Sequence, residues 1–319
     1  MAAPPSARSR APRSSVRGGE ALSSGRCWEG ESPMTEIAPT LDADVLSRWV
    51  GREQRLADAL DPAQARRMQM TLDEDATLAP GDALPPLWHW IYFLETAPMR
   101  RLGRDGHPAR GGFLPPVALP RRMWAGGRMT FPGDLPVGAA AEKVSTIRAV
   151  APKSGRSGSL CFVTVGHEIL ADGRVAVSEE QDIVFREDPA PGAPRPAAPA
   201  APEGAVWRET VTPSTTLLFR YSALTFNGHR IHYDRDYARE VEGYPALVFH
   251  GPLTATLLCR FGLARLGASR PARFAYRGAA PLFDDRPFTL CGKPDGAGGA
   301  SLWAETPEGG LAMSAELAV

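Results

Sequence analysis

The chain has 319 residues, 43% of them hydrophobic, and its 36 Lys and Arg residues balance 36 Asp and Glu residues. A chain of this length forms two modest domains or one large one, with enough apolar residues for a sizeable core. Because the charges balance, no overall field favours nucleic acid or an anionic membrane. An anionic ligand would therefore have to be held by individual arginine residues.

The cysteines and the apolar stretches predict a protein of the cytoplasm. Cys27, Cys161, Cys259 and Cys291 form no Cys-x-x-Cys pair, so the sequence indicates neither a disulfide framework nor a structural zinc site. The most apolar stretches, such as 87–94, are interrupted or too short to cross a hydrocarbon core of about 30 Å. We therefore expect a reducing cytoplasmic location and neither a membrane nor a nucleic-acid partner.

Residues 1–33 are rich in Arg and Ser, poor in acidic residues, and without the apolar run of a secretory signal. One interpretation is an organelle transit peptide; the other is a disordered extension, with Met34 beginning the functional chain. No apolar stripe accompanies the arginines, so we favour the disordered extension. A protein that begins at Met34 is then expected to keep its fold and turnover.

Residues 189–202 are almost entirely Pro and Ala, a composition typical of an extended, solvated polyproline segment. We interpret this segment as a linker that is dispensable for activity. It divides the ordered chain into an amino-terminal domain, 34–188, and a carboxy-terminal domain, 203–319. Each part ends in a strand-rich region preceded by helical sequence, which indicates an internal duplication.

The amino-terminal part begins with a helical pattern. Apolar residues recur at near-helical spacing over 44–60, which stops at Asp61-Pro62, and a second short helix is expected through Met68. Later, 160–169 and 175–185 are rich in Val, Ile, Phe and Thr. The Asp172-Gly173 pair between them suits a type I′ turn, so we predict a β-hairpin.

The carboxy-terminal part predicts one core helix followed by a meander of strands. Apolar residues fall on one face of 252–266, and Gly267 suits the position after the helix. Four short strands are expected at 273–276, 287–291, 301–305 and 311–317. A helix against several antiparallel strands is typical of the hot-dog fold. A weak echo between 128–131 and 273–276 agrees with a duplication.

Half of the six histidines fall within 22 residues of the carboxy-terminal part: His229, His232 and His250. Histidine is the side chain that titrates near neutral pH, so this clustering indicates acid–base chemistry. The surrounding sequence is Tyr-Ser-Ala-Leu-Thr-Phe-Asn-Gly-His-Arg-Ile-His-Tyr-Asp over 221–234, followed by His-Gly-Pro at 250–252.

This sequence resembles the signature of the MaoC-like hydratases, in which an acid, an Asn and a Pro precede a hydrophobic residue and a His. His232 keeps the histidine, whereas Asn227, His229 and Arg230 stand at the Asp, Asn and Pro positions. These departures are similar to the subgroup of hydroxyacyl-thioester dehydratase type 2 and the mesaconyl- and itaconyl-CoA hydratases. Segments 81–90, 111–116 and 121–127 resemble its degenerate amino-terminal domain.

The resemblance implies an α+β double hot dog, with two antiparallel sheets each wrapped on a central helix, and an enzyme that hydrates a short, dicarboxylic enoyl-CoA. In hydration, His232 would serve as base and acid, and Asn227 would hold water or substrate. Pro252 suits the first position of a helix, so Gly251 would offer a helix N-terminal N–H to the developing enolate oxygen. The candidate catalytic residues are His232, Asn227, Gly251 and His229, and the candidate substrate-binding residues are Tyr221, Arg230, His250, Arg121 and Arg122.

No cofactor is expected, because CoA is part of the substrate. Several alternatives stay open. His229 and His232 could be structural, and His229-x-x-His232 with Asp234 permits a metal site, although no third histidine at a suitable spacing supports one. A 3-hydroxyacyl-thioester dehydratase of fatty acid synthesis, a non-catalytic acyl-thioester-binding module and a thioesterase are the competing functions. The sequence leaves the oligomeric state open, including a homodimer of double hot dogs.

Overall fold

The computed structural model describes residues 40–155, 158–188 and 195–319. The expectations for 1–33 and for the first part of the Pro/Ala segment, 189–194, lie outside these ranges. The strands are β1 (Glu53–Asp58), β2 (Arg121–Thr130), β3 (Ala141–Gly155), β4 (Gly158–Ala171), β5 (Arg174–Arg186), β6 (Trp207–Val211), β7 (Arg273–Gly278), β8 (Phe288–Pro294), β9 (Ala300–Glu305) and β10 (Leu311–Ala318). The α-helices are α1 (Ala43–Ser47), α2 (Pro62–Thr71), α3 (Thr215–Leu224) and α4 (Gly251–Leu266).

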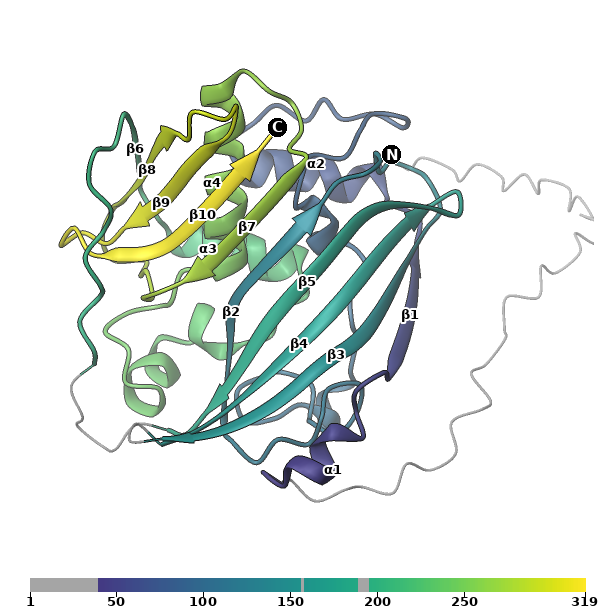
Figure 1. Cartoon of the computed structure of the whole chain (residues 1–319), viewed down its shortest axis with the longest axis vertical. Coiled ribbons are helices and arrows are strands. Elements are labelled where there is room, and N and C mark those ends of the chain that lie inside the picture. The colour runs from purple at the N-terminus through teal and green to yellow at the C-terminus, as the bar shows by residue number, and fades with distance from the viewer. Residues whose placement is uncertain (1–39, 156–157, 189–194) are drawn as a thin grey trace, which may run out of the picture. The chain divides into compact units, whose positions relative to one another are not determined.

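The ten strands form one antiparallel sheet in the order β1-β3-β4-β5-β2-β7-β10-β9-β8-β6. The first five strands in this order come from the amino-terminal half and the other five from the carboxy-terminal half, and α2, α3 and α4 lie behind the sheet in Figure 1. The two halves meet where β2 pairs with β7. This arrangement confirms the expected α+β hot-dog architecture, with the correction that the two expected sheets are joined into one continuous sheet.

The two segments that echo each other in sequence lie at this junction. Met129 pairs directly with Phe274, and these two residues occupy equivalent positions in the echo. Equivalent strands of two repeats pair in this way when a pseudo-twofold axis relates the repeats. The two hot dogs are therefore packed side by side as a pseudo-dimer within one chain.

The helix predicted over 44–60 is wrong for most of its length. The described structure has only the five-residue α1 here, and β1 follows as an edge strand paired with β3. Gly51 has a φ of 85°, which ends the helical path. The residues of β1 alternate between exposed and half-buried, the two-residue period of a strand. The second predicted helix is confirmed as α2, with Pro62 at its start.

The predicted hairpin is confirmed as β4 and β5. Asp172 and Gly173 have φ values of 49° and 74°, the positive values that a type I′ turn requires at both central positions. Alternate residues of β5 point to opposite faces. Glu179, Gln181 and Ile183 line the interior of the protein, whereas Asp182 meets Arg128 of β2 outside.

The predicted core helix is confirmed as α4. Gly267 ends it with a φ of 67°, and Leu253, Leu258 and Phe261 are buried against the sheet of the carboxy-terminal half. The described part of the amino-terminal half has no helix of this length. There, α1 packs with Val117 and Leu119 against β3, β4 and β5, and α2 belongs to the larger core that also contains α4. The four strands predicted after α4 are confirmed as β7 to β10.

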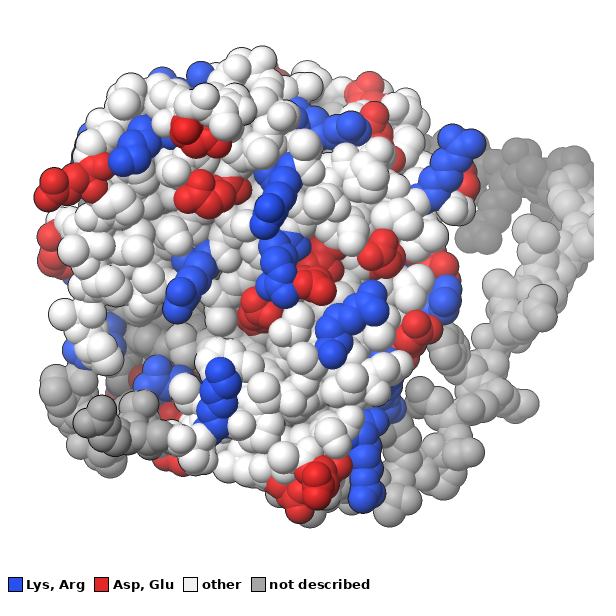
Figure 2. Space-filling view, viewed as in Figure 1, with Lys and Arg blue, Asp and Glu red and all other residues white. Residues whose placement is uncertain are grey.

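The face of the sheet turned toward the viewer carries both signs of charge, interspersed among uncharged residues (Figure 2). Arg128 of β2, for example, forms ion pairs with Glu180 and Asp182 of β5. This mixture fits the absence of any single-sign field that was expected from composition. None of the described helices is long and apolar enough to span a membrane.

The described part of the Pro/Ala segment makes backbone contacts with the carboxy-terminal half. The Leu311 N–H donates to the Pro199 carbonyl at 2.7 Å, and Ala200 forms a bridge with Gly310. The Arg195 guanidinium also lies over the ring of Phe283. This end of the segment therefore follows the protein surface, so the tether that links the two halves is shorter than 189–202.

Candidate active site

A cavity of about 600 Å³ lies between the two halves and is lined by both of them. The carboxy-terminal half contributes Asn227, His229, His232 and Gly251, four residues that were predicted to be catalytic. The amino-terminal half contributes residues of β2 and β5 and of the long segment that precedes β2. The structure therefore brings all four candidates together, and it adds a second set of side chains opposite them.

His232 lies in a 3₁₀ turn, Arg230–His232, and its side chain is almost fully buried. Its Nδ1 lies 2.7 Å from the carbonyl oxygen of Val248 and donates a hydrogen there, which leaves Nε2 as the free acceptor. Burial lowers the pKa of His232 to about 4. The imidazole is therefore neutral at pH 7, the form that accepts a proton from water.

Asn227 and His229 belong to the turn that follows α3. The Asn227 side-chain oxygen accepts the backbone N–H of His229 at 3.0 Å, so its amide group is left as a donor at the cavity wall. Burial and the neighbouring His107 and His232 lower the pKa of His229 to about 2. Both residues are neutral at pH 7, and the site has no titratable acid at position 227.

Gly251 is the first residue of α4, and its N–H belongs to the free end of the helix. A Cβ atom at this position would lie 3.6 Å from Cε3 of Trp124, so a side chain would fill the space in front of the helix N-terminus. A thioester carbonyl at this point meets the positive end of the helix dipole. The geometry thus supports the predicted oxyanion-binding role.

Tyr221 and His250 surround the histidine cluster from α3 and from the residue before α4. Tyr221 lines the cavity, and burial raises the pKa of its phenol. His250 is completely buried, hydrogen-bonds with Ser222 through Nε2 at 2.8 Å, and stacks on His232 with ring centroids 3.7 Å apart. Because His250 does not line the cavity, its position favours support of His232 over contact with substrate.

The candidate arginines differ in what they already bind. Arg121 forms ion pairs with Asp188 and Glu242 at 3.1 and 3.0 Å, and Arg230 is half-exposed and paired with Asp234 at 2.7 Å, outside the cavity lining. The structure therefore gives no support to a substrate-binding role for Arg230. The Arg230 pair also occupies Asp234, the third ligand of the metal alternative that the sequence permits.

Arg122 is different, because it lines the cavity and forms neither a hydrogen bond nor an ion pair with any residue that the structure describes. It pairs with Phe185 in the sheet, which places it toward the interior. Burial lowers the pKa of its guanidinium, and Asp105 opposes this only in part. A half-buried cation that makes no direct contact with a carboxylate in the described chain suits an anionic group of a ligand.

Two further residues at the histidine cluster had no role in the sequence analysis. Asp105 and His107 lie in the segment before β2, and the Asp105 carboxylate contacts His107 Nδ1 at 3.0 Å. The His107 ring lies 4.3 Å from the His229 ring, centroid to centroid. Asp105, His107 and His229 offer atoms within 4.8 Å of one another that could hold a metal ion. Asp105 and His107 lie more than 120 residues before His229 in the chain, so no sequence motif contains this group.

A polar network closes the cavity on the side of the amino-terminal half. Glu179 is buried and accepts hydrogen bonds from Trp90 and Gln181, and its Oε2 lies 2.9 Å from His89 Nε2. Burial by itself would raise the pKa of Glu179, but His89, together with His167 and Gln181, outweighs this effect and lowers the pKa to about 2. His167 has a buried Nε2 without a hydrogen-bond partner among the described residues. His89 is buried and also lines the cavity.

Residues 87–284 match the family of hydroxyacyl-thioester dehydratase type 2. The chain belongs to this family of hydro-lyases, and it has their double hot-dog fold. The resemblance inferred from the Asn227 to His232 motif is thereby confirmed.

Two relatives place the chain more narrowly. It is 50% identical over 270 residues to mesaconyl-C(4)-CoA hydratase of Chloroflexus aurantiacus, which covers 84% of this chain and 95% of that protein. It is 24% identical over 248 residues to the mitochondrial hydroxyacyl-thioester dehydratase type 2 of Schizosaccharomyces pombe, which covers 70% of this chain and 81% of that protein.

Solved structures agree on the fold. HtdX of Mycobacterium tuberculosis aligns with a TM-score of 0.60 and 19% identity over 84% of this chain and 99% of that chain. A MaoC-like dehydratase of Phytophthora capsici aligns with a TM-score of 0.62 and 14% identity over 86% and 97% of the two chains. These identities are too low to carry more than the architecture.

Proposed function

We propose that this protein catalyses the reversible addition of water to the double bond of a short, dicarboxylic enoyl-CoA of the mesaconyl type. The observation that carries the proposal is the position of His232, whose neutral Nε2 shares a cavity with the Gly251 N–H. A base and an oxyanion donor in one cavity are what hydration of an enoyl thioester requires. The 50% identity to a mesaconyl-C(4)-CoA hydratase supports the same reaction.

The residues divide the reaction as follows. His232 Nε2 takes a proton from water while the water oxygen bonds to C3, and the electrons of the double bond move to the thioester oxygen. The Gly251 N–H and the dipole of α4 hold the negative oxygen. The His232 imidazolium then returns its proton to C2, and the thioester carbonyl re-forms with CoA still attached. The Asn227 amide donates to the water or the substrate.

Arg122 supports a substrate that carries a second carboxylate. It lines the cavity together with His107 and His229, and its charge contributes to the lowered pKa values of both histidines. The phosphates of CoA are separated from the thioester by the length of the pantetheine arm, so the anion that meets Arg122 belongs to the acyl group. A dehydratase for long acyl chains would need an apolar tunnel, whereas this cavity also exposes Lys143 and Glu179.

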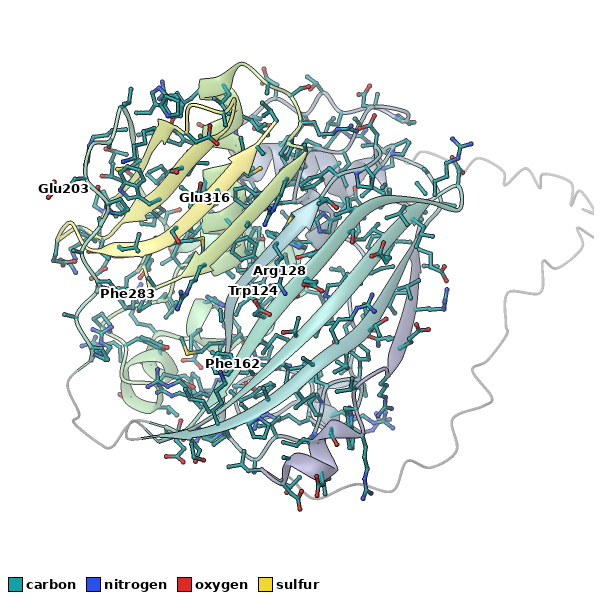
Figure 3. All side chains as sticks on the ribbon, in the orientation of Figure 1. Trp124, Arg128, Phe162, Glu203, Phe283 and Glu316 are labelled. Carbon is teal, nitrogen blue, oxygen red and sulfur yellow. The ribbon has the colours of Figure 1, made fainter. Side chains whose placement is uncertain are left out.

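The experiment compares mesaconyl-CoA with crotonyl-CoA, which lacks the second carboxylate, for the wild-type protein and Arg122→Gln. Charged hydrogen bonds are worth about 1.5–3 kcal/mol, so we expect Arg122→Gln to lose roughly ten- to a hundredfold in kcat/KM for mesaconyl-CoA only. Arg128→Gln is the matched control, because Arg128 lies on the same strand, is labelled in Figure 3, and pairs outside the cavity. A wild-type preference for crotonyl-CoA or longer chains would contradict the proposed substrate class.

A further inference from the structure

In the proposed reaction, a positive charge forms on His232, and its neighbours carry no negative charge to balance it. Proton transfer from water creates an imidazolium at His232, whose Nδ1–H faces a backbone carbonyl and whose ring stacks on neutral His250. Asn227 stands where the family's carboxylate is expected, and an amide carries no charge. A positive charge formed in such a buried place needs a counter-charge from another part of the chain.

Asp105 is the carboxylate that meets the histidine cluster within the described chain. Of the other acidic residues at the cavity, Glu242 is bound to Arg121, Glu179 is bound to His89 and Trp90, and Glu95 is exposed. Asp105 instead receives two contacts from His107, from the backbone N–H and from Nδ1, each at 3.0 Å. Burial would raise the Asp105 pKa, but the His107 contacts outweigh this and lower it, so the carboxylate is ionised.

These contacts fix the orientation of His107. An ionised Asp105 requires the hydrogen on Nδ1, so His107 presents the lone pair of Nε2. Both residues line the cavity with His229 and His232. The pair thus has the form of a carboxylate that orients a histidine, the arrangement that prepares an imidazole to accept a hydrogen from a reacting group.

The segment that carries this pair is held tightly against the catalytic turn. The Arg230 N–H donates to the Asp105 carbonyl at 2.9 Å. A Cβ atom at Gly106 would lie 2.0 Å from the Gly228 carbonyl oxygen, and a Cβ at Gly228 would lie 2.7 Å from that of Gly106. Both positions therefore require glycine for this approach, which brings His107 into ring contact with His229.

We propose that the Asp105–His107 pair, contributed by the amino-terminal half, is the second catalytic group of the site and replaces the carboxylate missing at Asn227. This inference rests on the proposed hydration. His107 Nε2 accepts one hydrogen of the attacking water, and Asp105 balances the charge. The other hydrogen passes as a proton to His232 and then to C2, while the hydrogen held by His107 stays on the oxygen and becomes that of the product hydroxyl.

A metal ion on Asp105, His107 and His229 is the competing use of these atoms. The Arg122 charge acts on both His107 and His229 and disfavours a second cation there, and the Asp105–His107 hydrogen bond already occupies one atom of each residue. Dialysis of the wild-type protein against a chelator, followed by metal analysis and an activity assay, distinguishes a metal site from a proton-transfer pair. We expect full turnover without metal.

The test measures kcat and KM of His107→Ala, His107→Gln and Asp105→Asn with the enoyl-CoA that the wild-type protein hydrates. We expect kcat to fall about a hundredfold for His107→Ala and at least about tenfold for Asp105→Asn, with KM within about threefold of wild type. His107→Gln should recover part of kcat, because its Oε1 can accept a hydrogen from water. Asp172→Asn is the matched control, since Asn is well tolerated at this exposed turn position.

The outcomes separate the two proposals. If the wild-type protein hydrates the substrate and His107→Ala equals it in kcat, the pair has no catalytic role. If the variants lose thermal stability together with kcat, and His107→Gln recovers neither, the role of the pair is structural. If turnover depends on a metal, these residues form a metal site instead. Either result overturns the inference. A wild-type protein that hydrates no enoyl-CoA refutes the proposed function, and the inference falls with it.

Discussion

Two neighbours and its burial each set one property of His232. The Val248 carbonyl fixes the tautomer, the stacked His250 fixes the ring plane, and burial keeps the imidazole neutral. His232→Ala should therefore reduce kcat by at least about a hundredfold with little change in thioester binding, because acid–base catalysis contributes 10²–10⁴-fold. Asn227→Ala should be damaging but less so, since it removes orientation only. A folded His232→Ala protein with near wild-type rate would make His229 the next candidate.

The pH dependence follows from the same burial. Hydration requires neutral His232, whose pKa is lowered from 6.5 to about 4. The rate should stay level as the pH falls through 6.5 and decline to half only near pH 4, as a kcat–pH profile in the hydration direction would show. A midpoint near 6.5 would mean that the base is an exposed histidine.

Stability has to be followed in the same experiment. His167 and His229 also have pKa values lowered below 6.5, by burial first. A lowered pKa in the folded state means that the unfolded chain binds more protons, so these groups contribute stability above pH 6.5 that is lost as the pH falls toward their folded values. We expect the thermal midpoint to decline below pH 6.5, and rates are to be compared only where the protein stays folded.

Helices and strands were predicted correctly where the hydrophobic residues follow a single helical or strand period. The 252–266 helix and the 160–185 hairpin were predictable because capping and turn residues coincide with an unbroken pattern. The 44–60 prediction failed because helical spacing at Val45, Leu46 and Trp49 continued by chance into Leu56 and Leu60. Pairing with β3 decides the strand: Arg55 lies opposite Val144, and its side chain contacts Glu142, 87 residues away, so this contact is invisible locally.

The β2–β7 junction depends on two glycines. A Cβ at Gly126 would lie 2.6 Å from the Tyr276 carbonyl oxygen, and one at Gly127 would lie 2.5 Å from the Tyr276 hydroxyl oxygen. Gly126→Ala should therefore force the two halves apart locally and lower the free energy of unfolding by about 1–3 kcal/mol, measured by urea denaturation. Gly112→Ala is the control, because no atom lies within 4 Å of its Cβ. Equal stability of both variants would show that the junction tolerates separation.

At the scale of the whole molecule, the two halves share one sheet and one cavity. The residues predicted to be catalytic all belong to 203–319, whereas Arg121 and Arg122, predicted to bind substrate, belong to 34–188. The four catalytic candidates meet in the cavity, and the predicted Arg122 lines it from the other half together with Asp105 and His107, which were not predicted. Asp105 and His107 belong to no local motif and reach the site only through tertiary packing, so the sequence could predict the motif-bearing side and Arg122 but not this pair.

The most direct measurement is the mass and thiol content of the product formed from mesaconyl-CoA. The account predicts loss of the conjugated enoyl-thioester absorbance, a product heavier by one water molecule with CoA still attached, and no free thiol. The His232→Ala protein should form no such product at a comparable enzyme concentration. Release of free CoA would indicate thioester hydrolysis, and binding without any change in the thioester would indicate a non-catalytic module; either result would contradict the account.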